Sequence, residues 1–194
     1  AIQAGTSHNL GTNFAKAFEI RYQDENGKLQ EVWQTSWGVS TRIIGTLIVV
    51  HGDDFGLRLP STLAPFQMVI VPIWKTPEEQ KSVNTFIAQV KKLLPAIRLH
   101  VDDREGMTAG FKFSFWEAKG VPLRMEIGPR DVAGASCMVA LRKNIKDKRI
   151  VKMDDLAKTI PLLLQEIDDD LFATAENFMH KNMHKIHDYD AFKK

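Results

Sequence analysis

From residue 66 onward, the chain alternates between two patterns of hydrophobic and polar positions. Phe66–Ile73 is short, apolar and rich in β-branched residues, which is typical of a buried strand. Thr76-Pro77-Glu78-Glu79 follows as a capping box with proline at the first helical position, and apolar residues then recur at helical spacing. Strands that alternate with helices predict an α/β domain with a mostly parallel sheet.

The rest of this region completes the predicted alternation. Thr108 to Lys119 is expected to form a helix that ends at Gly120, with Phe111 and Phe115 on its core-facing side. The remaining expected elements are strands at 97–101, 121–127 and 136–142, and a last helix from near Asp154 that buries Leu156, Ile160, Leu163, Ile167 and Leu171. Pro161 is expected to kink that helix.

The first 60 residues have a weaker pattern. Ala15–Tyr22 is expected to be extended, and Asn26-Gly27 between half-polar runs predicts a hairpin. The apolar stretch in Arg42–His51 fits a buried strand or a buried helix, and its periodicity does not decide between them.

Composition excludes several classes of protein. The chain has 194 residues, of which 44% are hydrophobic and 26% charged, as in globular domains. One cysteine excludes an internal disulfide framework, and no apolar run reaches the roughly 18 residues of a membrane span. The net charge of +2 does not by itself indicate nucleic-acid binding, but residues 101–152 hold 11 Lys and Arg against 7 Asp and Glu.

That basic region also interleaves aromatic residues with cations. Single-stranded nucleic acid stacks its bases on rings while cations contact its phosphates. Phe111 and Phe115 are explained by the core, whereas Phe113, Glu117 and Arg124 lie off that stripe and can face outward.

Two histidine-containing segments have simpler explanations than a metal site. His51-Gly52-Asp53-Asp54 could bind a metal or act in acid–base chemistry, but a polar turn is favoured. His180 and His184 are spaced to share a helix face, with His187 nearby, yet a solvated helix tail is favoured.

Four blocks of sequence, in this order, closely resemble those of prolyl-tRNA synthetases of the archaeal and eukaryotic type. They are AGTSHNLGTNFAKAFEI, WQTSWGVSTRIIGTLIVVHGDDFGL, APFQMVIVPI and GFKFSFWEAKGVPLRMEIGPRD. The resemblance implies a class II synthetase fold. Residues 1–63 would be the C-terminal part of an antiparallel-sheet catalytic domain, 64–166 an α/β anticodon-binding domain, and 167–194 the helical start of a further domain.

The resemblance also implies roles for individual residues. Gln3, Thr6, Ser40 and Arg42 match ATP contacts, with Gln3 also near Mg²⁺ and Arg42 as the motif 3 arginine. His8 and Trp37 match the proline pocket. The residues that match the anticodon-reading surface are Phe113, Glu117, Arg124, Arg130 and Asp131.

The implied activity is ATP-dependent activation of L-proline and its transfer to tRNA(Pro), in a cytoplasmic homodimer without a membrane anchor. Motifs 1 and 2 are absent from these residues, so the chain is expected to be an inactive C-terminal fragment of the enzyme. The alternative is a free-standing, non-catalytic tRNA-binding module. One departure is Arg58, a charge where the family usually has an apolar residue.

Overall fold

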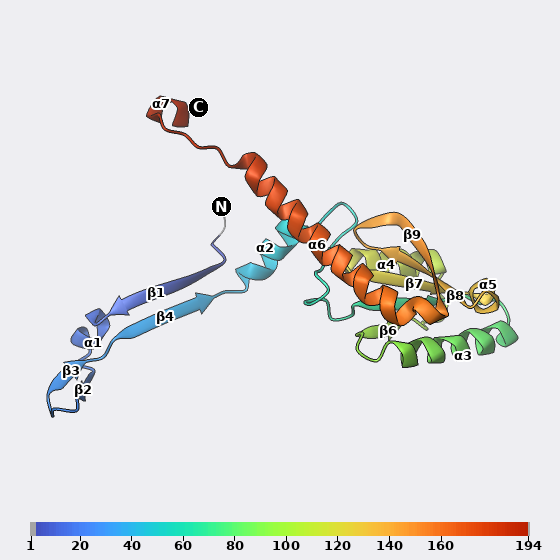
Figure 1. Cartoon of the computed structure of the whole chain (residues 1–194), viewed down its shortest axis with the longest axis horizontal. Coiled ribbons are helices and arrows are strands. Elements are labelled where there is room, and N and C mark those ends of the chain that lie inside the picture. The colour runs from blue at the N-terminus through green and yellow to red at the C-terminus, as the bar shows by residue number, and fades with distance from the viewer. Residues whose placement is uncertain (1–2, 194) are drawn as a thin grey trace. The chain divides into compact units, whose positions relative to one another are not determined.

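The computed structural model describes residues 3–193 (Figure 1), which divide into two compact units, one that ends at Val50 and one that begins at His51. Each unit has its own sheet structure and is described by itself. Within residues 3–193, no helix is both long enough and apolar enough to cross a membrane.

The first unit consists of two antiparallel strand pairs. Strand β1 (Gly5–Gly11) pairs with β4 (Gln34–Val39), and β2 (Arg21–Gln23) pairs with β3 (Leu29–Glu31). The predicted hairpin at Asn26-Gly27 is confirmed, because Gly27 takes the left-handed φ of 76° that this turn requires. The Asp24 carboxylate accepts hydrogen bonds from the backbone N–H groups of Asn26 and Lys28 and so closes the turn.

Two expectations for this unit are wrong. Helix α1 (Asn13–Ala17), whose Ala15 is buried, takes the first residues of the segment predicted to be extended, and only Arg21 and Tyr22 at its end lie on a strand. The Arg42–His51 stretch forms the helix α2, but none of its residues is buried, and Ile44 is 60% exposed. A helix satisfies its backbone hydrogen bonds internally, so this stretch needs no neighbouring strand to become ordered.

The second unit is built on a five-stranded sheet with the order β6-β5-β7-β8-β9. Strands β6 (Leu99–Val101), β5 (Met68–Pro72) and β7 (Leu123–Ile127) are parallel, as predicted. Strands β8 (Ser136–Leu141) and β9 (Asn144–Lys152) continue the sheet in antiparallel fashion. The α/β class is confirmed, but the sheet is mixed rather than mostly parallel because β8 runs antiparallel to β7, and β9, which was not predicted, runs antiparallel to β8.

Helices cover the sheet on both faces. The remaining helical elements are α3 (Pro77–Leu93), α4 (Ala109–Ala118), α5 (Pro129–Ala133), η1 (Met153–Asp155), α6 (Leu156–Asn182) and α7 (Tyr189–Phe192). The capping box at Thr76 and Glu79 is present, and the five residues predicted to be buried on α6 are buried. Helix α6 continues through Pro161.

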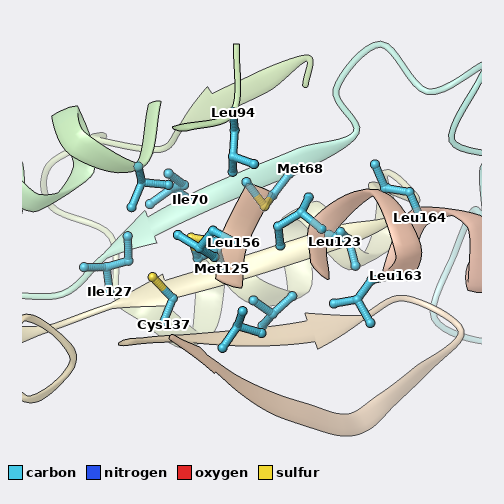
Figure 2. Close-up of a cluster of buried hydrophobic side chains, with 14 of the residues drawn as sticks. Met68, Ile70, Leu94, Leu123, Met125, Ile127, Cys137, Leu156, Leu163 and Leu164 are labelled. Atoms are coloured by element: carbon cyan, nitrogen blue, oxygen red, sulfur yellow. The ribbon is translucent and has the colours of Figure 1, made fainter. Parts of the chain in front are cut away.

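The two faces of β7 have different environments. Leu123, Met125 and Ile127 belong to the main core with residues of α3 and α6 (Figure 2). On the opposite face, a smaller cluster joins Val69 and Val71 of β5 to Trp116 of α4. The main core therefore lies on one side of the sheet, and the other side has room for polar chemistry.

The predicted orientation of α4 is wrong. Phe111 is 53% exposed and Phe115 only partly buried, whereas Lys112 and Trp116 point inward. Buried hydrogen bonds to Asp102 explain this orientation, since both Lys112 Nζ and Trp116 Nε1 donate to that residue. The hydrogen bonds to Asp102, rather than the spacing of Phe111 and Phe115, thus decide which face of α4 is buried.

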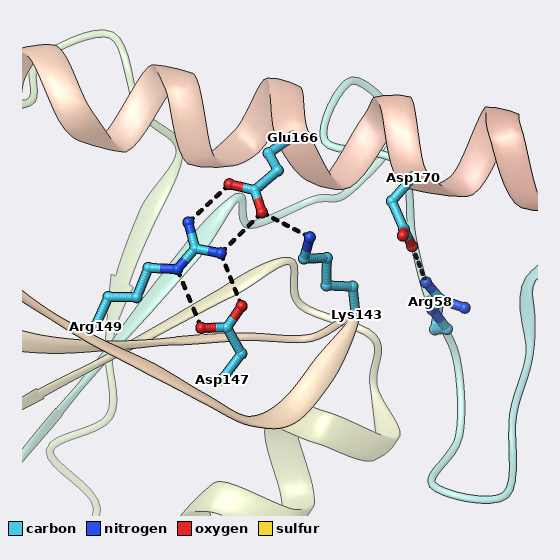
Figure 3. A network of polar contacts seen from close by, with 6 residues as sticks. All are labelled: Arg58, Lys143, Asp147, Arg149, Glu166 and Asp170. Carbon is cyan, nitrogen blue, oxygen red and sulfur yellow. Dashed lines mark hydrogen bonds and ion pairs between the residues drawn. The ribbon is translucent and has the colours of Figure 1, made fainter.

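Ion pairs attach α6 to the strands and to the segment before β5 (Figure 3). Glu166 accepts hydrogen bonds from Arg149 at 2.7 and 2.8 Å and from Lys143 at 2.6 Å. Arg58, the unusual charge in the sequence, donates to Asp170 at 2.7 Å. The same helix presents Asp168 to the backbone N–H and hydroxyl of Ser61.

The Glu166 contacts should make stability depend on pH. Hydrogen bonds from Arg149 and Lys143 lower the pKa of Glu166 to about 2. Because the folded pKa lies below the unfolded value of about 4.3, the stabilisation is complete above that value and is lost as pH falls toward the folded pKa. Urea denaturation should therefore show that Glu166→Gln destabilises the protein near neutral pH and that the difference from wild type shrinks in acid.

The matched control is Glu176→Gln, on the exposed part of α6, where Glu176 has no ion pair among residues 3–193. A constant difference between wild type and Glu166→Gln across this pH range would contradict the assignment.

Candidate functional sites

Three of the four residues matched to ATP contacts line one cleft of the first unit. The cleft has a volume of about 990 Å³, and Gln3, Ser40 and Arg42 contribute to its wall, together with Thr46 and Val49 of α2. Arg42 is the first residue of α2, and its backbone N–H lies 3.4 Å from Ser40 Oγ. Thr6 lies on β1 opposite Gly38 and is not part of this wall.

The chemistry of this cleft suits a phosphate-bearing ligand. A guanidinium can hold phosphate oxygens in a bidentate manner and stays charged at physiological pH. The side-chain amide of Gln3 and the hydroxyl of Ser40 add neutral hydrogen-bonding groups. No carboxylate lines the cleft among the described residues, so a divalent cation there would depend on oxygens of the ligand and water.

His8 and Trp37, both matched to the proline pocket, lie on opposite faces of the β1–β4 pair. His8 is opposite Ser36 and Trp37 is opposite Ser7 in the register. Since directly opposed residues share a face and successive residues alternate, the two side chains emerge on different sides. Trp37 is 79% exposed in this unit, so these two strands alone do not bring the pair together.

A polar cluster in the second unit centres on Arg124. Arg124 and Glu126 lie on the face of β7 opposite the main core, and Glu117 reaches them from α4. The Arg124 guanidinium donates to Glu117 Oε1 and, at 3.1 Å, to Glu126 Oε1. Its central carbon is 4.1 Å from the centroid of the Phe113 ring, which is a cation–π distance.

Lys148 of β9 completes this group, which we call the Arg124 cluster: Phe113, Glu117, Arg124, Glu126 and Lys148. Lys148 Nζ lies 2.9 Å from Glu126 Oε1 and 5.6 Å from the centre of the Phe113 ring. The register Arg124–Ala140–Lys148 across three strands puts both cations on one face of the sheet. Two carboxylates, two cations and an aromatic ring therefore share one surface.

The Arg124 cluster differs from the expectation that these residues face outward. Arg124 is only 6% exposed, and Phe113 and Glu117 are partly buried. Ion pairs with two carboxylates and stacking on the Phe113 ring offset the desolvation cost of burying the guanidinium. The Nε–H of Arg124 is buried without a hydrogen-bond partner among residues 3–193, so an acceptor reaches it only if the surrounding side chains move.

Arg130 and Asp131 form a second group at the other end of β7. Both lie on α5, where Asp131 Oδ2 accepts from the Gly128 backbone N–H at 2.8 Å and caps the helix. They line a cleft of about 510 Å³ with Trp74 and Lys75. The five residues matched to anticodon reading thus occur as two groups.

Arg142 connects the Arg124 cluster to the turn at Asp53–Gly56. Its guanidinium donates to both Asp53 oxygens, at 2.6 and 2.8 Å, and to the Glu117 carbonyl at 2.8 Å. Hydrogen bonds from Arg142 lower the pKa of Asp53. The favoured interpretation of this segment as a polar turn is confirmed, since Asp53 also accepts from the Phe55 N–H and pairs with Gly56.

The other candidates do not assemble into a site. Helix α6 ends at Asn182, so His184 does not share a helix face with His180. No group of three His, Cys, Asp or Glu side chains in residues 3–193 is arranged to hold a metal. Burial raises the pKa of the Cys137 thiol to about 12, which leaves it unreactive.

Sequence reasoning missed two members of the Arg124 cluster. Glu126 could have been found from strand alternation, because it lies two residues after Arg124. Lys148 could not be placed without β9. Exposed and less exposed residues alternate along this strand, but its many charged residues hide the alternation in the sequence.

Known proteins resemble this chain in both of its units. Residues 67–162 match the family described as an anticodon binding domain. The proline–tRNA ligase of Arabidopsis thaliana chloroplasts and mitochondria is 45% identical over the whole chain, and that of Chloroflexus aurantiacus is 46% identical. The chain covers 37% and 41% of these two relatives.

A solved structure shows the same similarity in three dimensions. The prolyl-tRNA synthetase of Cryptosporidium parvum, complexed with L-proline and AMP, superimposes with a TM-score of 0.87 and 40% sequence identity. The match covers 97% of this chain and 41% of that protein. Over its whole length the chain is therefore similar to part of prolyl-tRNA synthetases, and it spans about two fifths of the length of the relatives that it matches.

Proposed function

We propose that this chain is the part of a proline–tRNA ligase that combines one wall of the ATP site with the anticodon-binding domain. The reaction joins L-proline to tRNA(Pro) in two steps, activation by ATP and transfer to the tRNA. The observation that carries this proposal is the Arg124 cluster, which suits base reading and lies in the region that matches anticodon binding domains.

In the first unit, Arg42 is assigned to the phosphates of ATP, with Gln3, Thr6 and Ser40 as further contacts. Attack of a carboxylate on the α-phosphate needs positioned positive charge rather than a covalent nucleophile. His8 and Trp37 are assigned to the proline pocket. Because their side chains lie on opposite faces of the β1–β4 pair, a pocket that contacts both would need residues from other parts of the enzyme. Mg²⁺, bound through ATP oxygens and contacted by Gln3, would neutralise phosphate charge.

In the second unit, residues 64–166 are assigned to anticodon recognition, with 167–194 as the start of another domain. Proline anticodons share two guanines. A carboxylate can accept from the N–H donors of guanine, and an arginine can donate to its O6 and N7. Glu117 and Arg124 offer both chemistries side by side, and Phe113 offers a ring for stacking.

Phosphate binding alone would not favour this arrangement. Each of Glu117 and Glu126 repels an RNA backbone, and together they neutralise Arg124 and Lys148. Acidic groups become useful where base donors are read. Arg130 and Asp131 offer the same pair of chemistries at the second group. The family resemblance also supports a homodimer in the cytoplasm.

Replacing Arg124 should reduce discrimination between bases rather than overall RNA affinity. Arg124→Met should reduce the binding free energy for tRNA(Pro) by about 1–3 kcal/mol. The loss should be much smaller for a tRNA whose two shared guanines are substituted. Lys146→Met is the control, because Lys146 is exposed on β9 and outside the cluster; it should weaken both tRNAs alike. Titrations at two salt concentrations measure this, and an equal loss for both tRNAs in Arg124→Met would reduce Arg124 to a phosphate contact.

Replacing Arg42 in the full-length enzyme should slow activation of proline. The loss of one guanidinium directed at transition-state charge costs about 3 kcal/mol, or about a hundredfold in rate. Proline-dependent exchange of pyrophosphate into ATP measures this step, and tRNA affinity should stay unchanged. Arg21→Ala is the control, since Arg21 lies on exposed β2; an Arg42→Ala enzyme as fast as this control would refute the assignment.

A further inference from the structure

A polar cleft opens at the carboxyl ends of the parallel strands β5 and β6, apart from the Arg124 cluster. It has a volume of about 300 Å³ and is lined by residues from four segments, among them Trp74, Gln80, Arg104, Glu105, Ala109 and Lys112. The carboxyl ends of parallel strands are where α/β sheets commonly bind ligands. None of the residues matched to anticodon reading lines this cleft.

Lys112 forms part of the cleft wall although its side chain is only 7% exposed. Its ammonium donates to the backbone carbonyl of Asp102 at 3.0 Å and is 3.9 Å from Asp102 Oδ1, beyond hydrogen-bond length. An ammonium has three N–H donors, and the carbonyl takes one of them. A buried ammonium with unused donors is costly unless an acceptor reaches it.

The Asp102 carboxylate is already occupied by other partners. Arg104 donates to Oδ1 at 2.8 Å and to Oδ2 at 2.7 Å, and Trp116 Nε1 donates to Oδ2 at 2.8 Å. These hydrogen bonds, Arg104 first, hold the pKa of Asp102 well below its usual range, so the carboxylate stays ionised. One carboxylate thus faces two cations, and Arg104 takes both of its oxygens while Lys112 has only the backbone carbonyl.

The surroundings of the cleft complement an anion. Gln80 contributes an amide from α3, and Ala109 lies in the first turn of α4, where backbone N–H groups point away from the helix. Gly106, also in the cleft wall, has a φ of +73°, and a Cβ on it would meet no atom within 4 Å, so the loop there is not crowded. Glu105 is the one carboxylate that lines the cleft among the described residues, and it is exposed.

We propose that this cleft binds a phosphate group, with the Lys112 ammonium as the central contact and Arg104 and Gln80 at its sides. A phosphate would accept hydrogen bonds from the remaining Lys112 donors. The phosphate could belong to a free nucleotide or to an RNA backbone, and Trp74 in the wall would contact the attached group. The site depends on this chain alone and does not rest on the proposed ligase activity.

NMR titration of the whole chain with inorganic phosphate tests the proposal. The indole N–H of Trp116, which bonds to Asp102, and the amides of residues 104–109 should shift in a saturable way. Lys112→Met should weaken binding by about tenfold or more, since a charged hydrogen bond is lost. Lys119→Met is the control because Lys119 is exposed on the same helix outside the cleft, and it should bind as wild type does.

Competition identifies the source of the phosphate. Displacement of inorganic phosphate by AMP would indicate a free nucleotide, and displacement by an anticodon stem-loop RNA would indicate the RNA backbone. If neither competes, the ligand is free phosphate.

Absence of saturable shifts, or unchanged binding in Lys112→Met, would overturn the proposal. If Lys112→Met does not fold, Glu105→Gln replaces it, because removing the exposed carboxylate should tighten phosphate binding without disturbing the core. Unchanged or weaker binding in Glu105→Gln would then overturn the proposal.

Discussion

The alternation of side chains along β7 is the constraint on which the second unit depends. Leu123, Met125 and Ile127 point into the main core, and Arg124 and Glu126 point to the other face. A shift of one residue would bury both charges among α3 and α6 and expose the core residues. The position of β7 in the middle of the sheet, between β5 and β8, fixes this register from both sides.

Burial of charge on the second face is possible because carboxylates and cations are matched closely. Arg124 has Glu117 and Glu126, and Arg142 has Asp53. Removing one partner from such a pair leaves an uncompensated buried charge, so these pairs hold each other in place. Arg142 also binds the carbonyl of Glu117, which orients the carboxylate that faces Arg124. A ligand that reads bases here would meet side chains that are already ordered.

Much of the fold follows from local sequence, whereas the details of the site depend on distant partners. The strand at Met68–Pro72 and the helix after Thr76 were predictable because their apolar periods and capping residues are local. The inward rotation of α4 was not, since it depends on Asp102 receiving hydrogen bonds from Lys112 and Trp116. Strand β9 was hidden by its charges, of which Arg149 pairs with Glu166 of α6 and Lys148 with Glu126 of β7. The residues matched to ATP contacts came from the family resemblance, and three of them, Gln3, Ser40 and Arg42, line one cleft.

The central claim is that the Arg124 cluster reads bases, and the most direct test observes the Arg124 side chain itself. Its Nε–H is buried and lacks a partner in the described structure, so its NMR signal should report a rearrangement of the cluster around a bound base. Titration with the anticodon stem-loop of tRNA(Pro) should shift the Arg124 Nε–H and the Phe113 ring signals, and a stem-loop with both guanines replaced should not. Shifts confined to exposed lysines and arginines, with Arg124 and Phe113 unmoved by either RNA, would contradict the account.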